Sequence, residues 1–222
     1  MFFRKSLANK MIIGITGSFG TGKTTVANMF SKYGFKIINV DKLYHGIYNK
    51  NDSLKNRIKK EFGTTNRSQL KKIVFNDHVQ LKKLNKLTHP IIINEIKKEI
   101  IAIIGKSNKK IIINKNKKLV NGKNNIETKN NVKIVLDVPL LIEAKMQNMV
   151  DKIVVVKCNE KTQIGRLLKK GRHTKEEIEN IIKSQMPIKE KTKYADFVVN
   201  NSKAIKETEK LVKAIASLLQ KP

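Results

Sequence analysis

Cysteine is nearly absent from the 222-residue chain, in which Cys158 is the single one. An intrachain disulfide and a zinc site closed by several cysteines are therefore excluded. No apolar run approaches the roughly 18 residues that a membrane-spanning helix needs. The first ten residues, MFFRKSLANK, lack the apolar stretch of a signal peptide, and Met11 is an alternative start because a strand pattern begins there. These absences predict a soluble protein of a reducing compartment, the cytoplasm, with no membrane partner.

Acidic residues are also scarce, since 18 Asp and Glu stand against 47 Lys and Arg and give a formal net charge of +29. Such a balance is typical of proteins that bind polyanions. The cations, however, are 42 Lys and only 5 Arg, beside 23 Asn. Proteins that read nucleic acid usually use Arg, whose planar fork pairs with bases and phosphates, whereas adenine- and thymine-rich codons also produce a chain rich in Lys, Asn and Ile. We therefore expect no nucleic-acid partner, and the sequence leaves the oligomeric state open.

Strand and helix patterns alternate along the chain, which is typical of an α/β fold with a parallel sheet flanked by helices. Strands are predicted at 11–16, 36–40, 133–137, 152–157 and 197–199, and helices at 160–170, at 175–185 and up to about residue 219. Only helical patterns occur from 42 to 104, and Pro90 is predicted in the first turn of the last of these helices, where its missing N–H costs nothing. We expect a single domain over 11–221, preceded by a ten-residue extension, 1–10.

The stretch 105–133 differs in composition, because its 29 residues hold 9 Lys and 8 Asn against one acid, Glu127. This composition favours a solvated low-complexity loop. The alternative is a small hairpin that turns at Asn121-Gly122 and has Ile111–Ile113 as an extended piece. Since the stretch lies outside every motif described below, we interpret it as an insertion that is dispensable for catalysis.

A phosphate-binding loop is the strongest motif, because eight consecutive residues match G-x-x-x-x-G-K-[ST] between a predicted strand and a predicted helix. They are Gly17, Ser18, Phe19, Gly20, Thr21, Gly22, Lys23 and Thr24. The glycines let successive N–H groups point at phosphate oxygens, and the helix N-terminus adds a partial positive charge. Lys23 reaches the β- and γ-phosphates, and the Thr24 hydroxyl is a ligand for Mg²⁺. The loop predicts a nucleotide site.

Several classes of protein have this loop, and other features of the sequence decide between them. Asn49-Lys50-Asn51-Asp52 matches the guanine-reading motif of GTPases, but it lies before the third strand and no D-x-x-G occurs in the chain, so we interpret the match as chance. A nucleic-acid motor needs a longer core. Small-molecule kinases have this length, a helical lobe after the second strand and a basic lid near the C-terminus.

Two acids are predicted at the carboxyl ends of strands, where open α/β sheets bind ligands. Asp41 ends the second predicted strand, beside the end of the first, and can orient or deprotonate an acceptor hydroxyl. It can also act as the N-cap of the following helix. Asp137 ends the third strand as an acid that can hold Mg²⁺ directly or through water.

The sequence resembles the dephospho-CoA kinase family from Met11 to about Leu219. The family's opening pattern reads IGITGSFGTGKT at 13–24, and the strand that ends in Asp reads INVD at 38–41. RSQLKKIVF at 67–75 and the pair His89-Pro90 follow. DVPLLIE at 137–143, SQMP at 184–187 and ADFVVNN at 195–201 are the most specific runs.

The resemblance implies a P-loop kinase fold that transfers the γ-phosphoryl group of ATP, with Mg²⁺, to the ribose 3′-hydroxyl of dephospho-CoA. It implies that Asp41 is the acceptor-side acid and that Asn201 lies near the adenine. The helical lobe at 42–104 would hold dephospho-CoA, with Arg67 and His89 as binding residues. The lid, at 160–185, departs from the family's R-L-x-x-R-D, because Lys170 and Gly171 replace the Arg-Asp pair. Lys170 keeps the charge, and Arg172 is the alternative cation.

Two other functions remain open at this point. A kinase of another small substrate, such as a nucleoside or nucleotide, would share the phosphate loop but leave DVPLLIE and SQMP unexplained. A nucleic-acid-binding ATPase would explain the net charge, and it would show a steep salt dependence of DNA binding.

Overall fold

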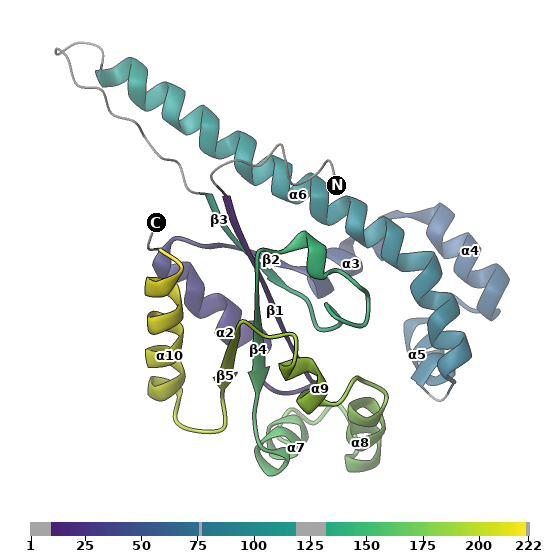
Figure 1. Ribbon diagram of the computed structural model, residues 1–222. Helices are drawn as coiled ribbons and strands as arrows, with labels where there is room; N and C mark the ends of the chain where they lie inside the picture. Colours follow the sequence, from purple (N-terminus) through teal and green to yellow (C-terminus); the bar gives the residue numbers. More distant parts are fainter. Residues whose placement is uncertain (1–9, 76, 119–131, 221–222) are drawn as a thin grey trace.

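A five-stranded parallel sheet forms the centre of the computed structural model, which describes residues 10–75, 77–118 and 132–220 (Figure 1). The strands are β1 (Lys10–Gly17), β2 (Lys36–Asn39), β3 (Val132–Asp137), β4 (Lys152–Lys157) and β5 (Phe197–Asn200). They lie in the order β2-β3-β1-β4-β5. The central strand β1 pairs with β3 and β4, so that Ile13 lies opposite Val135 on one side and Lys152 on the other. The predicted α/β fold with a parallel sheet is confirmed.

Helices cover both faces of the sheet and build a lobe beside it (Figure 1). Their bounds are α2 (Lys23–Met29), α3 (Val40–Lys50), α4 (Asp52–Phe62), α5 (Arg67–Phe75), α6 (His78–Lys118), α7 (Glu160–Leu168), α8 (Lys175–Lys183), α9 (Ile188–Thr192) and α10 (Ile205–Leu218). Two short 3-10 helices are η1 (Phe30–Tyr33) and η2 (Gln147–Met149). In the described part of the chain, none of these helices combines the length and the apolar character that a membrane crossing requires.

The core consists of two apolar clusters, one on each face of the sheet. On one face, strand residues such as Ile13 and Ile15 pack against α2 and α10, with Val26 and Val212 buried between them. On the other face, strand residues pack against α6 through Ile96 and Ile100, both of which are fully buried. Burial on both faces explains why the strands read as continuous apolar runs rather than as alternating ones.

A third cluster, which we call the lobe cluster, holds α3, α4 and α5 together away from the sheet; its buried members are Tyr48, Leu54, Ile58, Leu70 and Val74. Figure 1 shows these helices gathered at the N-terminal part of α6. Helix α6 belongs to both regions, because Leu87 and Ile91 pack against the lobe cluster and Ile96 packs against the sheet. At 1.5 Å per residue, its 41 residues make α6 about 60 Å long.

The position of Pro90 corrects one prediction. Pro90 lies in the interior of α6 rather than in the first turn of a helix. Its ring removes one backbone N–H from the helical ladder. The preceding turn has its own stabilising bond, because the Thr88 hydroxyl donates to the Leu84 carbonyl at 2.9 Å. Apolar packing on both sides of Pro90 holds one continuous helix where the sequence pattern indicated a start.

The predicted insertion at 105–133 is also partly wrong. Helix α6 continues to Lys118, so residues 105–118 form neither the favoured loop nor the extended piece at Ile111–Ile113. Figure 1 shows the C-terminal end of α6 projecting beyond the sheet. The predicted turn at Asn121-Gly122 lies outside the described residues.

The junction of β2 and α3 corrects the placement of Asp41. Strand β2 ends at Asn39, and α3 begins at Val40. The Asn39 side chain is the N-cap, since its Oδ1 accepts a hydrogen bond from the Lys42 backbone N–H at 2.8 Å. Asp41 therefore lies in the first turn of α3 and is not the cap. Because β3 separates β2 from β1, Asp41 is also not beside the end of β1 in the sheet.

Candidate active site

The phosphate loop is closed by donors that converge on one backbone carbonyl. The Ser18 carbonyl accepts hydrogen bonds from Lys23 Nζ at 2.8 Å and from Thr21 Oγ1 at 2.9 Å. Gly20 and Gly22 have φ values of +83° and +88°, which L side chains rarely adopt. A Cβ on Gly22 would also lie 2.2 Å from the Asn201 side-chain nitrogen. The two glycines are thus required by backbone conformation and, at Gly22, by close approach.

Asn201, which follows the edge strand β5, supports the start of α2. Its Nδ2 donates to the Thr21 carbonyl at 2.9 Å, and its Oδ1 accepts from the Thr208 hydroxyl at 3.0 Å. Asn201 is buried. The structure therefore brings Asn201 to the phosphate loop, where it fixes the loop backbone.

The predicted metal residues meet at the carboxyl end of β3. The Thr24 hydroxyl and the Asn39 side-chain amide both donate to Asp137 Oδ2 at 2.7 Å. The other carboxylate oxygen, Oδ1, is buried and has no hydrogen-bond partner within the described ranges. Burial raises the pKa of Asp137, and the Thr24 hydrogen bond, the Lys23 charge and the Asn39 hydrogen bond oppose that rise. An orphaned carboxylate oxygen beside a threonine hydroxyl fits a hard cation such as Mg²⁺, which oxygen ligands bind.

Lys23 is the most strongly perturbed cation of the site. Burial lowers its pKa to about 8, and Lys191 lowers it as well, whereas Asp137, Asp41 and Glu143 raise it. Among the described residues, the Ser18 carbonyl is the hydrogen-bond acceptor that holds the Lys23 ammonium. A buried ammonium of this kind favours a ligand that carries negative charge, because phosphate oxygens would stabilise its protonated form.

Asp41 faces the same region from α3. Partial burial raises the pKa of Asp41, which keeps an exposed surface, while Lys23 lowers it, Asp137 raises it, and His45 and Arg67 lower it. From the first turn of α3, Asp41 therefore interacts with Lys23 and Asp137 at the phosphate loop and with His45 and Arg67 in the lobe. Asp41 therefore joins Lys23 and Asp137 in one site, as predicted, although it arrives there from a helix.

Arg67 and His45 form a polar group on the acceptor side, in which Arg67 carries the positive charge. The Arg67 guanidinium contacts both ring nitrogens of His45, with Nη2 at 3.1 Å from Nε2. It also lies over the rings of Tyr44, at 6.0 Å, and Tyr48, at 5.7 Å. Burial and the Arg67 charge lower the pKa of His45. Sequence reasoning missed His45, but its spacing of four residues after Asp41 places both on one helix face and could have identified it.

His89 is not part of this group. It lies in α6, where burial lowers its pKa, and no hydrogen bond or ion pair of His89 occurs in the parts of the chain that the structure describes. Of the two lobe residues predicted to bind dephospho-CoA, the structure thus brings Arg67, but not His89, into contact with His45.

The cations of the lid region differ in how exposed they are and in whether they lie beside the phosphate loop. Lys170 and Arg172 are both exposed. Arg166, in the last turn of α7, has a buried Nη1 atom with no hydrogen-bond partner among the described residues. That atom would lie 3.8 Å from a Cβ built on Gly22 of the phosphate loop. Arg166 therefore lies beside the phosphate loop, and sequence reasoning missed it because several cations share the run at 166–172.

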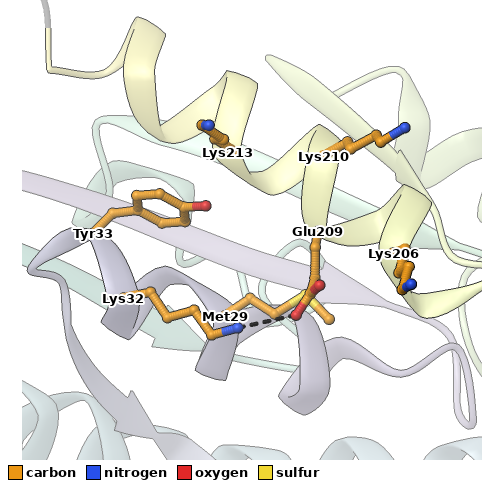
Figure 2. A pocket seen from close by; sticks show the side chains of 7 residues that line it. All are labelled: Met29, Lys32, Tyr33, Lys206, Glu209, Lys210 and Lys213. Atoms are coloured by element: carbon orange, nitrogen blue, oxygen red, sulfur yellow. Dashed lines mark hydrogen bonds and ion pairs between the residues drawn. The ribbon is translucent and has the colours of Figure 1, made fainter.

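Two hollows lie outside the site. One, of about 400 Å³, lies between η1 and α10 and is lined by Met29, Lys32, Tyr33, Lys206, Glu209, Lys210 and Lys213 (Figure 2). Its Glu209 is already paired with Lys32 at 3.0 Å. The other, of about 670 Å³, lies between α3 and α6. It is lined by Lys42, Leu43, Gly46 and Ile47, which are on the opposite face of α3 from Asp41 and His45. Neither hollow includes the phosphate loop.

Comparison with known proteins identifies the family. The sequence model of the dephospho-CoA kinases matches residues 11–115 and 117–207. The dephospho-CoA kinase of Carboxydothermus hydrogenoformans is 36% identical over 218 residues, which cover 95% of this chain and 93% of that protein. That of Aquifex aeolicus is 34% identical over 211 residues, with 91% and 94% covered. The chain belongs to the dephospho-CoA kinase family.

Solved structures share the fold of this chain. The Thermus thermophilus protein TT1252 is 26% identical, with a TM-score of 0.71, and the match covers 96% of this chain and all of that one. The dephospho-CoA kinase of Campylobacter jejuni is 23% identical with a TM-score of 0.59, over 95% and 97% of the two chains, and supports the fold. The P-loop kinase fold is confirmed. Dephospho-CoA kinases catalyse the last step of coenzyme A biosynthesis, in which ATP phosphorylates the ribose 3′-hydroxyl of dephospho-CoA to give CoA and ADP.

Proposed function

We propose specific roles for the residues that meet around the phosphate loop. Gly17 to Thr24 bind the phosphates of ATP, with Lys23 on the β- and γ-phosphates. Asn201 fixes the loop at the adenine end of the site, and Arg166 contacts the nucleotide from α7. The observation that carries the proposal is the convergence of Lys23, Asp137 and Asp41 through mutual electrostatic interactions. It sets a donor-side cation, a metal-holding acid and an acceptor-side carboxylate in one place.

Thr24 and Asp137 would hold Mg²⁺ at the carboxyl end of β3. The ion would supply charge neutralisation of the phosphate oxygens during transfer. The unpartnered Oδ1 of Asp137 supports this role. The described residues contain no group of three or more His, Cys, Asp or Glu side chains that could bind a metal by themselves. This agrees with Mg²⁺, which usually keeps waters and substrate phosphates as ligands.

Asp41 is the acceptor-side base in this proposal. It takes the proton of the ribose 3′-hydroxyl as that oxygen forms a bond to the γ-phosphorus. The bond between the γ-phosphorus and the β–γ bridging oxygen breaks at the same time, and ADP leaves with that oxygen. Burial raises the pKa of Asp41 and so makes its carboxylate a better proton acceptor.

Dephospho-CoA lies in the helical lobe, 42–104, in this assignment. Arg67 binds its anionic part, because a guanidinium pairs with phosphate oxygens through a planar fork. His89 contributes from α6. Lys170 and Arg172 contact the transferring phosphoryl group from the lid, 160–185. The substrates are then dephospho-CoA and ATP, no nucleic acid is needed, and the reaction takes place in the cytoplasm.

A coupled ADP-release assay tests the proposal. The purified chain is given ATP with dephospho-CoA, adenosine or shikimate, in Mg²⁺ and then in excess chelator. We expect turnover with dephospho-CoA alone, loss of turnover in chelator and restoration by Mg²⁺. Equal turnover with adenosine or shikimate would reject the acceptor assignment. Stimulation by random DNA, steeply weakened by salt, would instead favour a nucleic-acid-dependent ATPase.

A further inference from the structure

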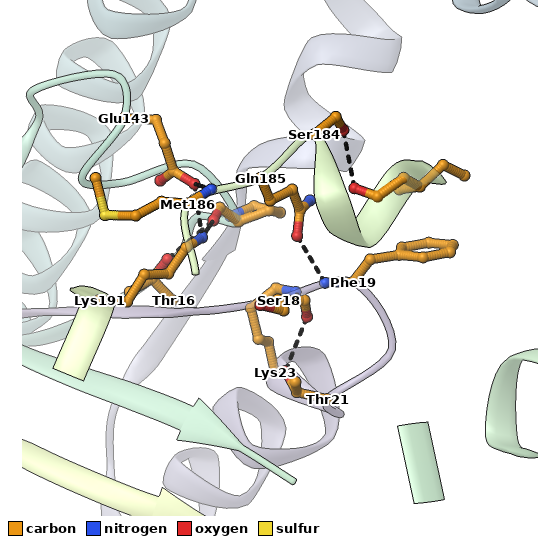
Figure 3. Close-up of polar contacts among 12 residues, drawn as sticks. Thr16, Ser18, Phe19, Thr21, Lys23, Glu143, Ser184, Gln185, Met186 and Lys191 are labelled. Atoms are coloured by element: carbon orange, nitrogen blue, oxygen red, sulfur yellow. Dashed lines mark hydrogen bonds and ion pairs between the residues drawn. The ribbon is translucent and has the colours of Figure 1, made fainter. Parts of the chain in front are cut away.

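Phe19, the third residue of the phosphate loop, is held by the lid region on both sides of its backbone. Its N–H donates to Gln185 Oε1 at 2.8 Å, a contact that Figure 3 shows. Its carbonyl accepts from Gln163 Nε2 at 2.5 Å. Its ring meets the His173 ring edge-on, with centroids 5.7 Å apart. Gln163 lies in α7, His173 between α7 and α8, and Gln185 after α8, so three parts of the lid region meet at one loop residue.

The Gln185 contact acts on the peptide group that holds Lys23. The Phe19 N–H and the Ser18 carbonyl belong to one planar peptide unit. That carbonyl accepts from Lys23 Nζ and from Thr21 Oγ1. Since the peptide plane turns as a unit, fixing its N–H with Gln185 also fixes the direction of its carbonyl. Hydrogen bonds on both ends of one peptide polarise and strengthen each other.

The segment that carries Gln185 is itself anchored. The next residue, Met186, donates its N–H to Glu143 Oε1 at 3.3 Å, and Glu143 pairs with Lys191 at 2.8 Å. Lys191 is fully buried and donates to the Pro139 carbonyl at 3.1 Å, which also accepts from the Thr16 hydroxyl at 2.9 Å. Figure 3 shows this network lying beside the phosphate loop. Gln185 thus reaches the loop from a platform tied to the ends of β1 and β3.

We propose that Gln185 is a positioning residue for phosphoryl transfer. Through the Ser18–Phe19 peptide it sets the direction from which Lys23 approaches the phosphates, and Gln163 fixes the other side of Phe19. The inference rests on the proposed function, because it assigns Gln185 a role that acts through Lys23. It also explains what SQMP and DVPLLIE do in this chain, since both runs supply members of the platform: Gln185 and Met186 from the first, Glu143 from the second.

Gln185→Met tests the proposal, because Met keeps the length of the side chain and removes the acceptor. We expect kcat to fall about 10- to 100-fold, since a misplacement of about 1 Å costs up to that much. The KM for dephospho-CoA should change less than about twofold, because the substitution does not touch the contacts that bind the acceptor. Amide hydrogen exchange at Phe19 should rise at least about tenfold without a matching loss of global stability.

Gln220→Met is the matched control. Gln220 likewise bonds to the backbone through its side-chain amide, as a donor to the Tyr33 carbonyl at 3.4 Å, but it follows α10 and lies outside the site. Its substitution should leave kcat unchanged. If Gln185→Met has the kcat of the parent while Lys23→Met is inactive, the positioning role is rejected and the function of the loop stands. An active Lys23→Met would instead reject the proposed function.

A second pair of variants separates hydrogen bonding from charge. Gln185→Glu and Gln163→Glu both place one negative charge beside Phe19. Only the first retains the group that Phe19 needs, because a carboxylate accepts but does not donate. We therefore expect Gln185→Glu to keep a higher kcat than Gln163→Glu. Equal kcat values, or the reverse order, would overturn the assignment of Phe19 as a residue held from both sides.

Discussion

The two halves of the site are built in different ways. Around the phosphate loop, polar side chains pair with one another in buried or part-buried networks, such as Asn201 with Thr208, or Asp137 with Thr24 and Asn39. In the helical lobe, the lobe cluster supplies the cohesion, and the half-buried cation Arg67 lies over two tyrosine rings. The donor side is thus fixed before any substrate arrives, and the acceptor side is held by stacking at a surface.

This difference separates two kinds of variant. Groups that are held in position before substrate binds act at their full strength in a transition state because they do not reorganise. Cations that are held only by stacking contribute mainly to binding. Substitutions at the loop and at Asp41 should therefore lower kcat, whereas substitutions of the lobe cations should raise the KM for dephospho-CoA.

Asp41 lies where the halves meet, and its substitution should have the largest effect. Asp41→Asn keeps the size of the side chain and removes its charge and basicity. We expect kcat to fall about 10²- to 10⁴-fold, the usual range for a positioned general base, with ATP affinity nearly unchanged. Because Asn39 caps α3, loss of a cap does not contribute. Single-turnover kinetics and ATP titration measure the two quantities, and near-parental transfer would show that Asp41 is not the base.

Within the lid, the comparison of the half-buried Arg166 with two exposed cations comes next. Arg166→Met should raise the KM for ATP about tenfold or more, because a hydrogen bond to a charged group contributes roughly 1.5–3 kcal/mol. Arg172→Ala and Lys170→Ala should slow transfer more than they weaken ATP binding. Steady-state kinetics with ATP as the varied substrate distinguish the three. If neither exposed substitution changes the rate of transfer, the lid does not contact the transferring phosphoryl group.

Arg67→Lys sharpens the description of the acceptor side. Lysine keeps the positive charge but loses the planar fork and the stacking on Tyr44 and Tyr48. We expect the KM for dephospho-CoA to rise about three- to tenfold, with kcat changed less than twofold. The same assay on Lys71→Arg, a surface substitution on α5, is the control. A fall in kcat without a change in KM would show that Arg67 acts in the chemical step rather than in substrate binding.

The pKa of Lys23, about 8, predicts a small proton uptake when ATP binds. The phosphates stabilise the ammonium and raise its pKa, so at pH 8 ATP binding should take up about half a proton. At pH 6 Lys23 is already charged, and the uptake should vanish. Calorimetry in two buffers of different ionisation enthalpy measures the uptake at each pH. Equal uptake at pH 6 and pH 8 would mean that another group is responsible.

The parallel sheet and the phosphate loop could be predicted from the sequence because their signals lie within short stretches of it. The strands are apolar runs, and the loop has a fixed spacing of residues. The end of β2 could not, since the buried Val40 extends the apolar run by one residue into α3. Pro90 was expected to begin a helix, and packing on both sides overrode that preference.

The candidate site also contains residues that could be predicted from the sequence and residues that could not. Lys23, Thr24, Asp41 and Asp137 follow from motif and strand order, and they meet in the structure. Arg166 could not be selected, because neighbouring cations compete with it in the sequence, and Gln185 could not, because an uncharged amide within a motif does not indicate which group it contacts. What distinguishes these two is contact with a loop more than 140 residues earlier in the chain, and no local pattern reports such a contact.

The strand order also has a consequence for the folding of the nascent chain. Strand β1 pairs with β3 and β4 but not with β2, so its first partner begins about 115 residues after β1 ends. At 5–20 residues per second, a ribosome needs roughly 6–20 s to cover that interval. During this time the helices of the lobe can form from local contacts, whereas both strands already made have unpaired edges. The phosphate loop, although it stands near the N-terminus, is therefore completed late in synthesis.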